Sequence, residues 1–169
     1  MESFLRYILR WPSLESVMGT SWAWPTCETF HFIGLALLVG IVGMFDLRIL
    51  GMAKRVPVAP LRQLLPWAAV GFVLCAVTGA MFVGGLGANL RGDHPYDVLM
   101  RDIWLQLKLV FIFLAGVNLL AFYLTGVART VNGLGPGDDA PLRAKVIAGS
   151  SLVLWVGVVW LGRLIPWGL

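Results

Sequence analysis

Four long apolar runs limit this 169-residue chain to few folds. They cover about residues 26–46, 64–88, 103–125 and 145–165. A helix needs roughly 20 apolar residues to cross a hydrocarbon core about 30 Å thick, and the strands of a membrane barrel are shorter and alternate in polarity. We therefore predict an all-α membrane protein, a four-transmembrane-helix bundle that occupies residues 1–169 as a single domain.

The composition also favours a protein that is surrounded by lipid and not by water. Hydrophobic residues make up 59% of the chain and charged residues only 13%, whereas soluble domains carry about 25% charge. The net charge of +4 comes from basic residues that are scattered singly, with no basic stripe interleaved with aromatics. We predict the lipid bilayer, and no nucleic acid, as the partner of this surface.

Residues 1–20 differ from the four runs. Charged residues alternate there with large apolar ones in a spacing that gives one apolar helical face, and the order of a cleavable signal sequence is missing. We predict an interfacial amphipathic helix that lies on the membrane surface and is broken near Pro12.

The basic residues predict the orientation of the bundle. Cytoplasmic loops of membrane proteins are enriched in Lys and Arg. The first and third loops carry seven basic residues: Arg48, Lys54, Arg55, Arg62, Arg129, Arg143 and Lys145. The two termini and the second loop carry five: Arg6, Arg10, Arg91, Arg101 and Arg163. We therefore expect both termini outside the cytoplasm.

Several titratable residues gather at this outer end. Ionisable groups inside a span are costly, so each is a candidate for function. Glu28 and His31 are three residues apart at the start of the first span, and Lys108 lies inside the third. Arg163 is near the outer end of the fourth span, and the outer loop holds Arg91, Asp93 and His94.

Two cofactors suit this outer group. For haem b, His31 would be the axial metal ligand, Gly34 would leave room for the flat ring, and Lys108, Arg163 or Arg91 would hold the propionates, with His94 or a methionine such as Met81 or Met100 as a second ligand. For a quinone, His31 would contact the ring, Glu28 would orient His31 and relay protons, and Lys108 and Arg163 would anchor anionic groups. The residues leave both alternatives open.

Other readings are weaker. Cys27 and His31 are spaced for copper on one helical face, but no methionine pair joins them. Transport would need broken helices and midplane polar sites, and few deep polar residues are present. The two cysteines are expected to be packing residues, not a disulfide.

Three further predictions concern packing within the bundle. We expect Asp46 to pair with Arg48 or Arg129 near the inner end, and Asn118 to hydrogen-bond to a neighbouring helix. Small residues recur one turn apart on the first two spans, a spacing that allows close helix packing: Ala36 and Gly40, and Gly71, Cys75 and Gly79.

Several segments resemble a known family. They are Trp24–His31, Gly34–Gly40 and Asp46–Gly51, followed by Leu65-Pro66-Trp67, Thr78-Gly79, Lys108 with Asn118, and Leu154-Trp155 with Gly162-Arg163. Together they resemble a bacterial family of small four-span membrane proteins that has no assigned reaction and is distantly similar to copper-resistance membrane proteins and b-type cytochrome anchors. The resemblance covers about residues 20–165 and singles out Glu28, His31, Asp46, Arg48, Lys108, Asn118 and Arg163. It implies a multi-pass protein of the bacterial inner membrane.

Two function classes follow. The first is a small membrane subunit of a redox or electron-transfer assembly that binds haem b or quinone near its extracytoplasmic face and has a membrane or periplasmic protein partner. The second is a cofactor-free structural subunit of a larger membrane complex. The sequence lacks the nucleophile and phosphate-loop motifs of hydrolases and kinases, so we do not expect an enzyme that acts alone.

Overall fold

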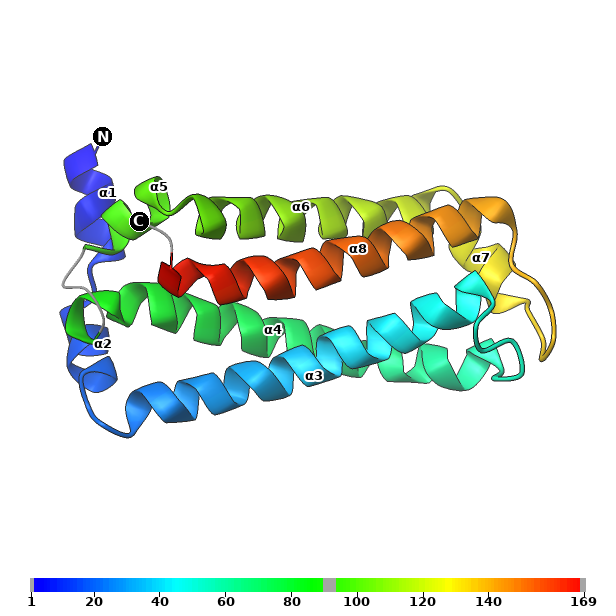
Figure 1. The fold of residues 1–169 in the computed structure, drawn as a ribbon, viewed down its shortest axis with the longest axis horizontal. Coiled ribbons are helices and arrows are strands. Elements are labelled where there is room, and N and C mark those ends of the chain that lie inside the picture. Colours follow the sequence, from blue (N-terminus) through cyan, green and yellow to red (C-terminus); the bar gives the residue numbers. More distant parts are fainter. Residues whose placement is uncertain (1, 90–93, 168–169) are drawn as a thin grey trace.

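The computed structural model describes residues 2–89 and 94–167, without the side chains of residues 86–89. Four long helices run side by side (Figure 1), and each is long and apolar enough to cross a membrane. They are α3 (Ala23–Leu50), α4 (Val58–Asn89), α6 (Ile103–Leu124) and α8 (Leu142–Leu164). The predicted four-helix membrane bundle is confirmed, and the chain fits a multi-pass membrane protein.

The helices are longer than several of the predicted spans. The 28 residues of α3 extend about 42 Å, which is more than the hydrocarbon core of about 30 Å. Hydrogen bonding within the helix therefore continues into the interfacial regions. Pro66 lies inside α4 without ending it, and α6 begins where the carboxylate of Asp102 accepts hydrogen bonds from the backbone N–H groups of Trp104 and Leu105.

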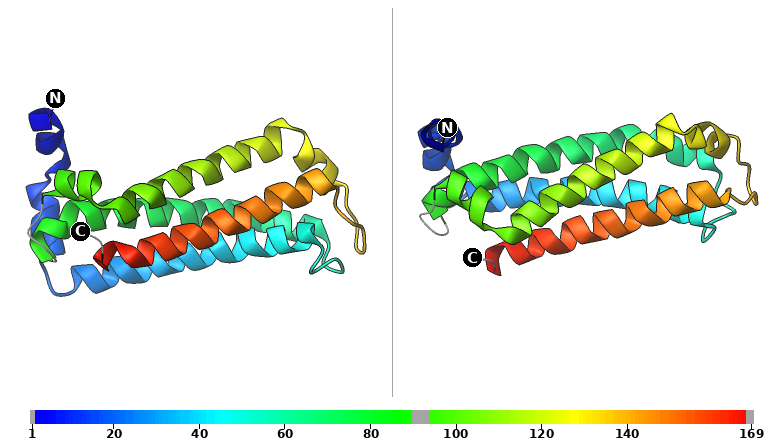
Figure 2. Two further views of the ribbon diagram at one scale, coloured as in Figure 1. Left: turned by 45° about the horizontal axis from the view of Figure 1, so that its top comes forward. Right: turned by 90° about the horizontal axis from the view of Figure 1, so that it is seen from above.

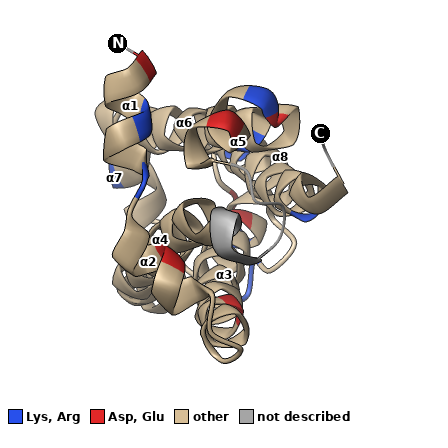
Figure 3. Ribbon diagram, turned by 90° about the vertical axis from the view of Figure 1, so that its left-hand side faces the viewer, with Lys and Arg blue, Asp and Glu red and all other residues tan. Residues whose placement is uncertain are grey.

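The four helices form two pairs. α3 packs along α4, α6 packs along α8, and α3 also contacts α8, whereas α4 and α6 barely touch along their described residues. Figure 2 shows the four helices as nearly parallel rods, and the view along the bundle in Figure 3 separates the α3–α4 pair from the α6–α8 pair. Large apolar side chains cover the outside, including Phe113, Leu124 and Val153. Such a surface is suited to acyl chains.

Short elements close one end of the bundle, which also carries both chain termini and is called the terminal end here (Figure 1). They are α1 (Glu2–Leu9), α2 (Pro12–Met18), α5 (Pro95–Arg101) and the 3₁₀ turn η1 (Ile165–Trp167). The predicted break near Pro12 is confirmed. α1 lies across the bundle axis (Figures 1 and 2) and has no buried residues, as expected for a helix on a membrane surface.

Two contacts hold the N-terminal helices in place. The guanidinium of Arg6 donates two hydrogen bonds of 2.8 and 2.7 Å to the carboxylate of Asp97 on α5 and lies 4.7 Å from the centre of the Tyr96 ring. These bonds lower the pKa of the Asp97 carboxyl. On α2, the side chain of Met18 is fully buried against Gly85 of α4. The bidentate ion pair between Arg6 and Asp97 holds α1 on α5. The buried side chain of Met18 holds α2 on α4.

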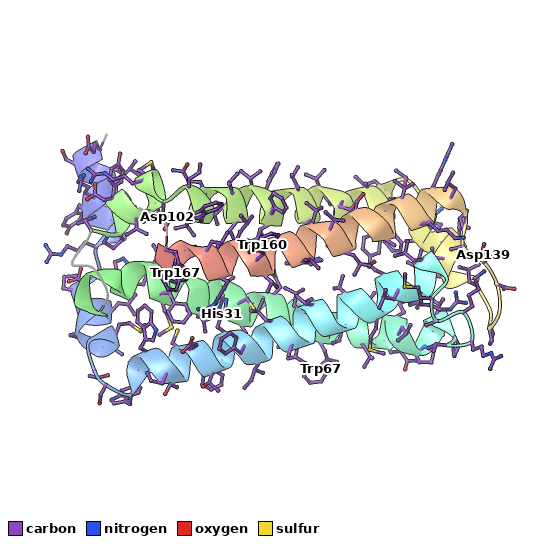
Figure 4. All side chains as sticks on the ribbon, viewed as in Figure 1. His31, Trp67, Asp102, Asp139, Trp160 and Trp167 are labelled. Atoms are coloured by element: carbon purple, nitrogen blue, oxygen red, sulfur yellow. The ribbon has the colours of Figure 1, made fainter. Side chains whose placement is uncertain are left out.

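The opposite end, called the loop end, is built around Arg48 and Asp139. It contains α7 (Val127–Asn132) and the segments 51–57 and 133–141. Asp139 forms ion pairs of 3.0 and 2.8 Å with Lys54 and Lys145, and both lysines lower the pKa of its carboxyl to about 2. Figure 4 shows Asp139 at this end of the bundle.

Two buried polar side chains at the loop end have other partners than the ion pair that we predicted. Arg48 is fully buried and donates to the backbone oxygens of Val56, Gly135 and Asp138. Asp46 is also buried, and its side-chain hydrogen-bond partner is Ser151 of α8. The prediction that Asp46 pairs with Arg48 or Arg129 was wrong, because loop carbonyls compete for the guanidinium of Arg48 and Arg129 is exposed.

Candidate functional site

His31 faces the interior of the bundle from α3 and contacts α4 (Figure 4). Its Nδ1 lies 2.7 Å from Oγ1 of Thr78. The same Oγ1 lies 2.6 Å from the backbone oxygen of Leu74, to which it donates. Two oxygens 2.6 Å apart must share a proton, so the single hydroxyl proton of Thr78 is used in its bond to Leu74. Thr78 therefore accepts from His31, and Nδ1 carries the proton.

This arrangement leaves Nε2 of His31 as a free acceptor. The ring is fixed by Thr78 and by an edge-on contact with Phe82, with centroids 5.6 Å apart. Within the described residues, Nε2 has no hydrogen-bond partner, and it is not fully buried. A lone pair of fixed direction thus remains accessible inside an apolar bundle.

Lys108 of α6 brings a positive charge to the same region. Its ammonium is close enough to His31 and Cys75 for charge–charge interaction. Gly162 of α8 leaves room for the Lys108 ammonium, because a Cβ at that glycine would lie 3.0 Å from Nζ. In the part of the chain that the structure describes, the ammonium has no carboxylate partner and no hydrogen-bond acceptor.

The two cysteines hold the backbone around His31. The sulfur of Cys75 on α4 lies 3.6 Å from the His31 carbonyl oxygen, and the sulfur of Cys27 on α3 lies 3.6 Å from the Thr78 carbonyl oxygen. Both thiols are free. They are packing residues, as predicted, and their reciprocal contacts tie the helix that carries His31 to the helix that carries its hydrogen-bond partner.

Glu28 does not orient His31. It is exposed on the outer surface of α3, whereas His31 is partly buried and is oriented by Thr78. Residues three apart are about 60° apart around a helix. On a helix that packs on two neighbours, this angle is enough to place one residue inside the bundle and the other outside.

Gly34 does not open space for a flat ring. A Cβ at Gly34 would lie 2.8 Å from the backbone oxygen of Gly71, and a Cβ at Gly71 would lie 2.6 Å from the backbone oxygen of Gly34. The missing side chains are used for close approach of α3 and α4. The predicted role of Gly34 in haem binding was therefore wrong.

The other predicted site residues lie apart from His31 or outside the description. His94 caps α5, with Nδ1 accepting a hydrogen bond of 3.2 Å from the backbone N–H of Tyr96. Arg163 is exposed, and its neighbour Gly162 borders Lys108 instead. Arg91 and Asp93 lie outside the described residues.

Sequence reasoning missed the roles of Thr78 and Gly162. Thr78 is one of the few polar residues deep in an apolar run, which was the available signal, but no spacing rule links it to His31 on another helix. Gly162 carried no signal beyond its place in the resemblance. Together with His31 and Lys108, these residues form a candidate polar site at the junction of all four long helices.

The site presents one fixed acceptor and one ammonium donor. The described residues contain no group of three or more His, Cys, Asp or Glu side chains arranged to hold a metal ion.

The chain matches no protein-family model, and no curated protein or solved structure matches it.

Proposed function

We propose that this protein is a small membrane subunit of a redox assembly and binds a quinone at its terminal end, with His31 and Lys108 as the polar contacts. The observation that carries the proposal is the pair of unpaired polar atoms, Nε2 and Nζ, that different helices hold close together in an apolar bundle. Unpaired polar groups in such surroundings are costly. A ligand that carries a hydrogen-bond donor and an acceptor on an otherwise apolar body would relieve that cost.

The arrangement of the helices favours a lipid-soluble ligand. α4 and α6 barely touch, and Lys108 of α6 reaches towards Cys75 of α4. A ligand dissolved in the bilayer would approach between these two helices. Its apolar tail would then remain among the acyl chains while its head group met the two polar atoms.

Haem b is the second candidate, favoured by the hydrogen bond from His31 to Thr78. Axial histidines commonly donate their second N–H to a fixed acceptor, which leaves Nε2 for the metal. Two observations make haem less suitable than quinone: the space at Gly34 is filled by α4, and His94 is used as a helix cap.

We also propose the setting of this site. The terminal end would face the outside of the bacterial inner membrane, because the loop end carries more of the basic residues. A membrane or periplasmic protein would then exchange electrons with the bound quinone. The exposed aromatic residues of this end, such as Tyr7, Trp11 and Trp22, would lie in the interface between that partner and the lipid head groups.

Direct binding tests the proposal. The purified protein in detergent with added phospholipid is titrated with a short-chain ubiquinone and, separately, with its reduced quinol form, and binding is followed by quenching of tryptophan fluorescence. We expect saturable binding of the quinol that weakens at least tenfold in His31→Leu and in Lys108→Met, while Glu28→Gln, on the exposed side of the same helix, binds like wild type. A circular-dichroism melt of each variant distinguishes loss of binding from loss of fold.

Three results would overturn the quinone proposal. Absence of binding by folded wild-type protein, with no quinone released on solvent extraction, would favour the cofactor-free structural subunit. A Soret band that disappears in His31→Ala would replace quinone with haem. Equal binding by wild type and both folded site variants would place the quinone elsewhere.

A further inference from the structure

We infer that the site holds the reduced quinol more tightly than the oxidised quinone. This inference rests on the proposed function and concerns its selectivity. It follows from the hydrogen-bond directions at His31, which identify the kind of group that the ligand must present.

The hydrogen bond at Nδ1 of His31 has a defined direction. The single proton of the Thr78 hydroxyl is committed to the backbone oxygen of Leu74 at 2.6 Å, so Thr78 accepts the proton of Nδ1 at 2.7 Å. With its proton on Nδ1, the neutral ring offers only a lone pair at Nε2. A second proton on the ring would place two positive charges near each other, because Lys108 already supplies one within the bundle.

The two forms of the ligand present different groups to Nε2. A quinone presents carbonyl oxygens, which only accept, so one facing Nε2 would bring two lone pairs together. A quinol presents hydroxyl groups, and one of them donates to Nε2 while the other accepts from Lys108. The ammonium donates to either form, so the discrimination comes from His31. An unmatched buried hydrogen-bonding pair lowers affinity by about tenfold or more.

The test measures both affinities at one pH, with the quinol form kept reduced by dithionite. We expect wild type to bind the quinol at least tenfold more tightly, which for a two-electron couple raises the midpoint potential of the bound ligand by about 30 mV. Thr78→Val removes the acceptor of Nδ1–H and releases the ring from one tautomer, so the preference should fall towards equal binding. Thr78→Ser keeps the hydroxyl and should keep the preference.

Thr29→Val is the matched control. Thr29 makes the same type of hydrogen bond to its own helix, from Oγ1 to the backbone oxygen of Pro25 at 2.8 Å, but it is exposed. This variant should retain the wild-type preference. Equal or tighter binding of the quinone by wild type would overturn the inference while leaving the proposed function intact. Failure of both forms to bind folded protein would overturn both.

Discussion

Arg48 joins two loops that are distant in the sequence. The residue lies near the end of α3, and its side chain is fully buried. It donates to Val56 in the segment after α3, and to Gly135 and Asp138 in the segment before α8. Buried backbone oxygens need partners, and a guanidinium supplies several donors in a fixed geometry. Arg48 thus replaces the regular hydrogen bonding that loops lack.

Replacing Arg48 should destabilise the protein more than replacing any exposed arginine at the same end. Arg48→Ala leaves backbone oxygens without partners, and we expect a loss of about 3 kcal/mol, or a fall of about 6–12 °C in Tm. Arg48→Lys keeps the positive charge but loses the several donors of the planar guanidinium. Its Tm should therefore lie between those of the alanine variant and wild type. The measurement is thermal unfolding in detergent, followed by circular dichroism.

The exposed Arg62 of α4 provides the control for Arg48. Arg62→Ala should melt within about 2 °C of wild type, because surface substitutions have small effects. If Arg48→Ala melted together with Arg62→Ala, the guanidinium would not be the link between the two loops.

Among the elements, α3 and α4 have the most extensive contact. Gly34 and Gly71 bring the two backbones together, with each glycine against the backbone oxygen of the other. Ala36 and Gly40, which have the same small-residue spacing in the sequence, are exposed. The expectation that this pair serves packing within the bundle was therefore wrong, whereas Gly71 and Cys75 do lie between the helices.

Alanine substitutions at two glycines of α3 should separate these roles. In Gly34→Ala the new Cβ meets the backbone of Gly71, and overpacking of this type costs about 1–3 kcal/mol. In Gly40→Ala the new Cβ has open space, and removing a glycine from a helix gains up to about 1 kcal/mol. We expect a lower Tm for Gly34→Ala and an unchanged or higher Tm for Gly40→Ala.

The ubiquinone affinity of the same two variants gives a second measurement. Gly34 lies one turn from His31, so separation of α3 from α4 should also weaken binding. An unchanged Tm and affinity in Gly34→Ala would mean that the two helices can move apart without cost, against the close packing described here.

For the molecule as a whole, the fold followed from the sequence because hydropathy and length decide whether a helix crosses a bilayer. Which side of each helix faces inward did not follow, because apolar residues surround the spans on all sides and lipid is as apolar as the core. Glu28 and His31 show the consequence. Glu28 was expected to orient His31, yet only His31 faces α4. Asn118 was predicted correctly as an interhelical donor, since it binds the backbone oxygen of Ile147 on α8.

The partner of His31 was beyond prediction for the same reason. The contact between His31 and Thr78 joins residues 47 positions apart, and its existence depends on the depth at which α3 and α4 cross. One turn from His31, Gly34 and Gly71 bring the two backbones into close contact. Single-sequence reasoning identified the polar residues that are costly in a membrane, but it could not determine which of them meet.

Orientation is the property of the whole molecule on which the setting of the site depends. The loop end carries seven of the basic residues counted above, against five at the terminal end. Reporter fusions should therefore give opposite results at the two ends. Alkaline phosphatase, which folds only in the periplasm, should be active when fused after residue 167 and inactive within residues 133–137, and a cytoplasmic fluorescent reporter should show the reverse. If the loop-end fusion were the one active as a phosphatase, His31 and Lys108 would lie near the cytoplasmic leaflet, and the proposed electron-transfer partner would have to be sought on that side.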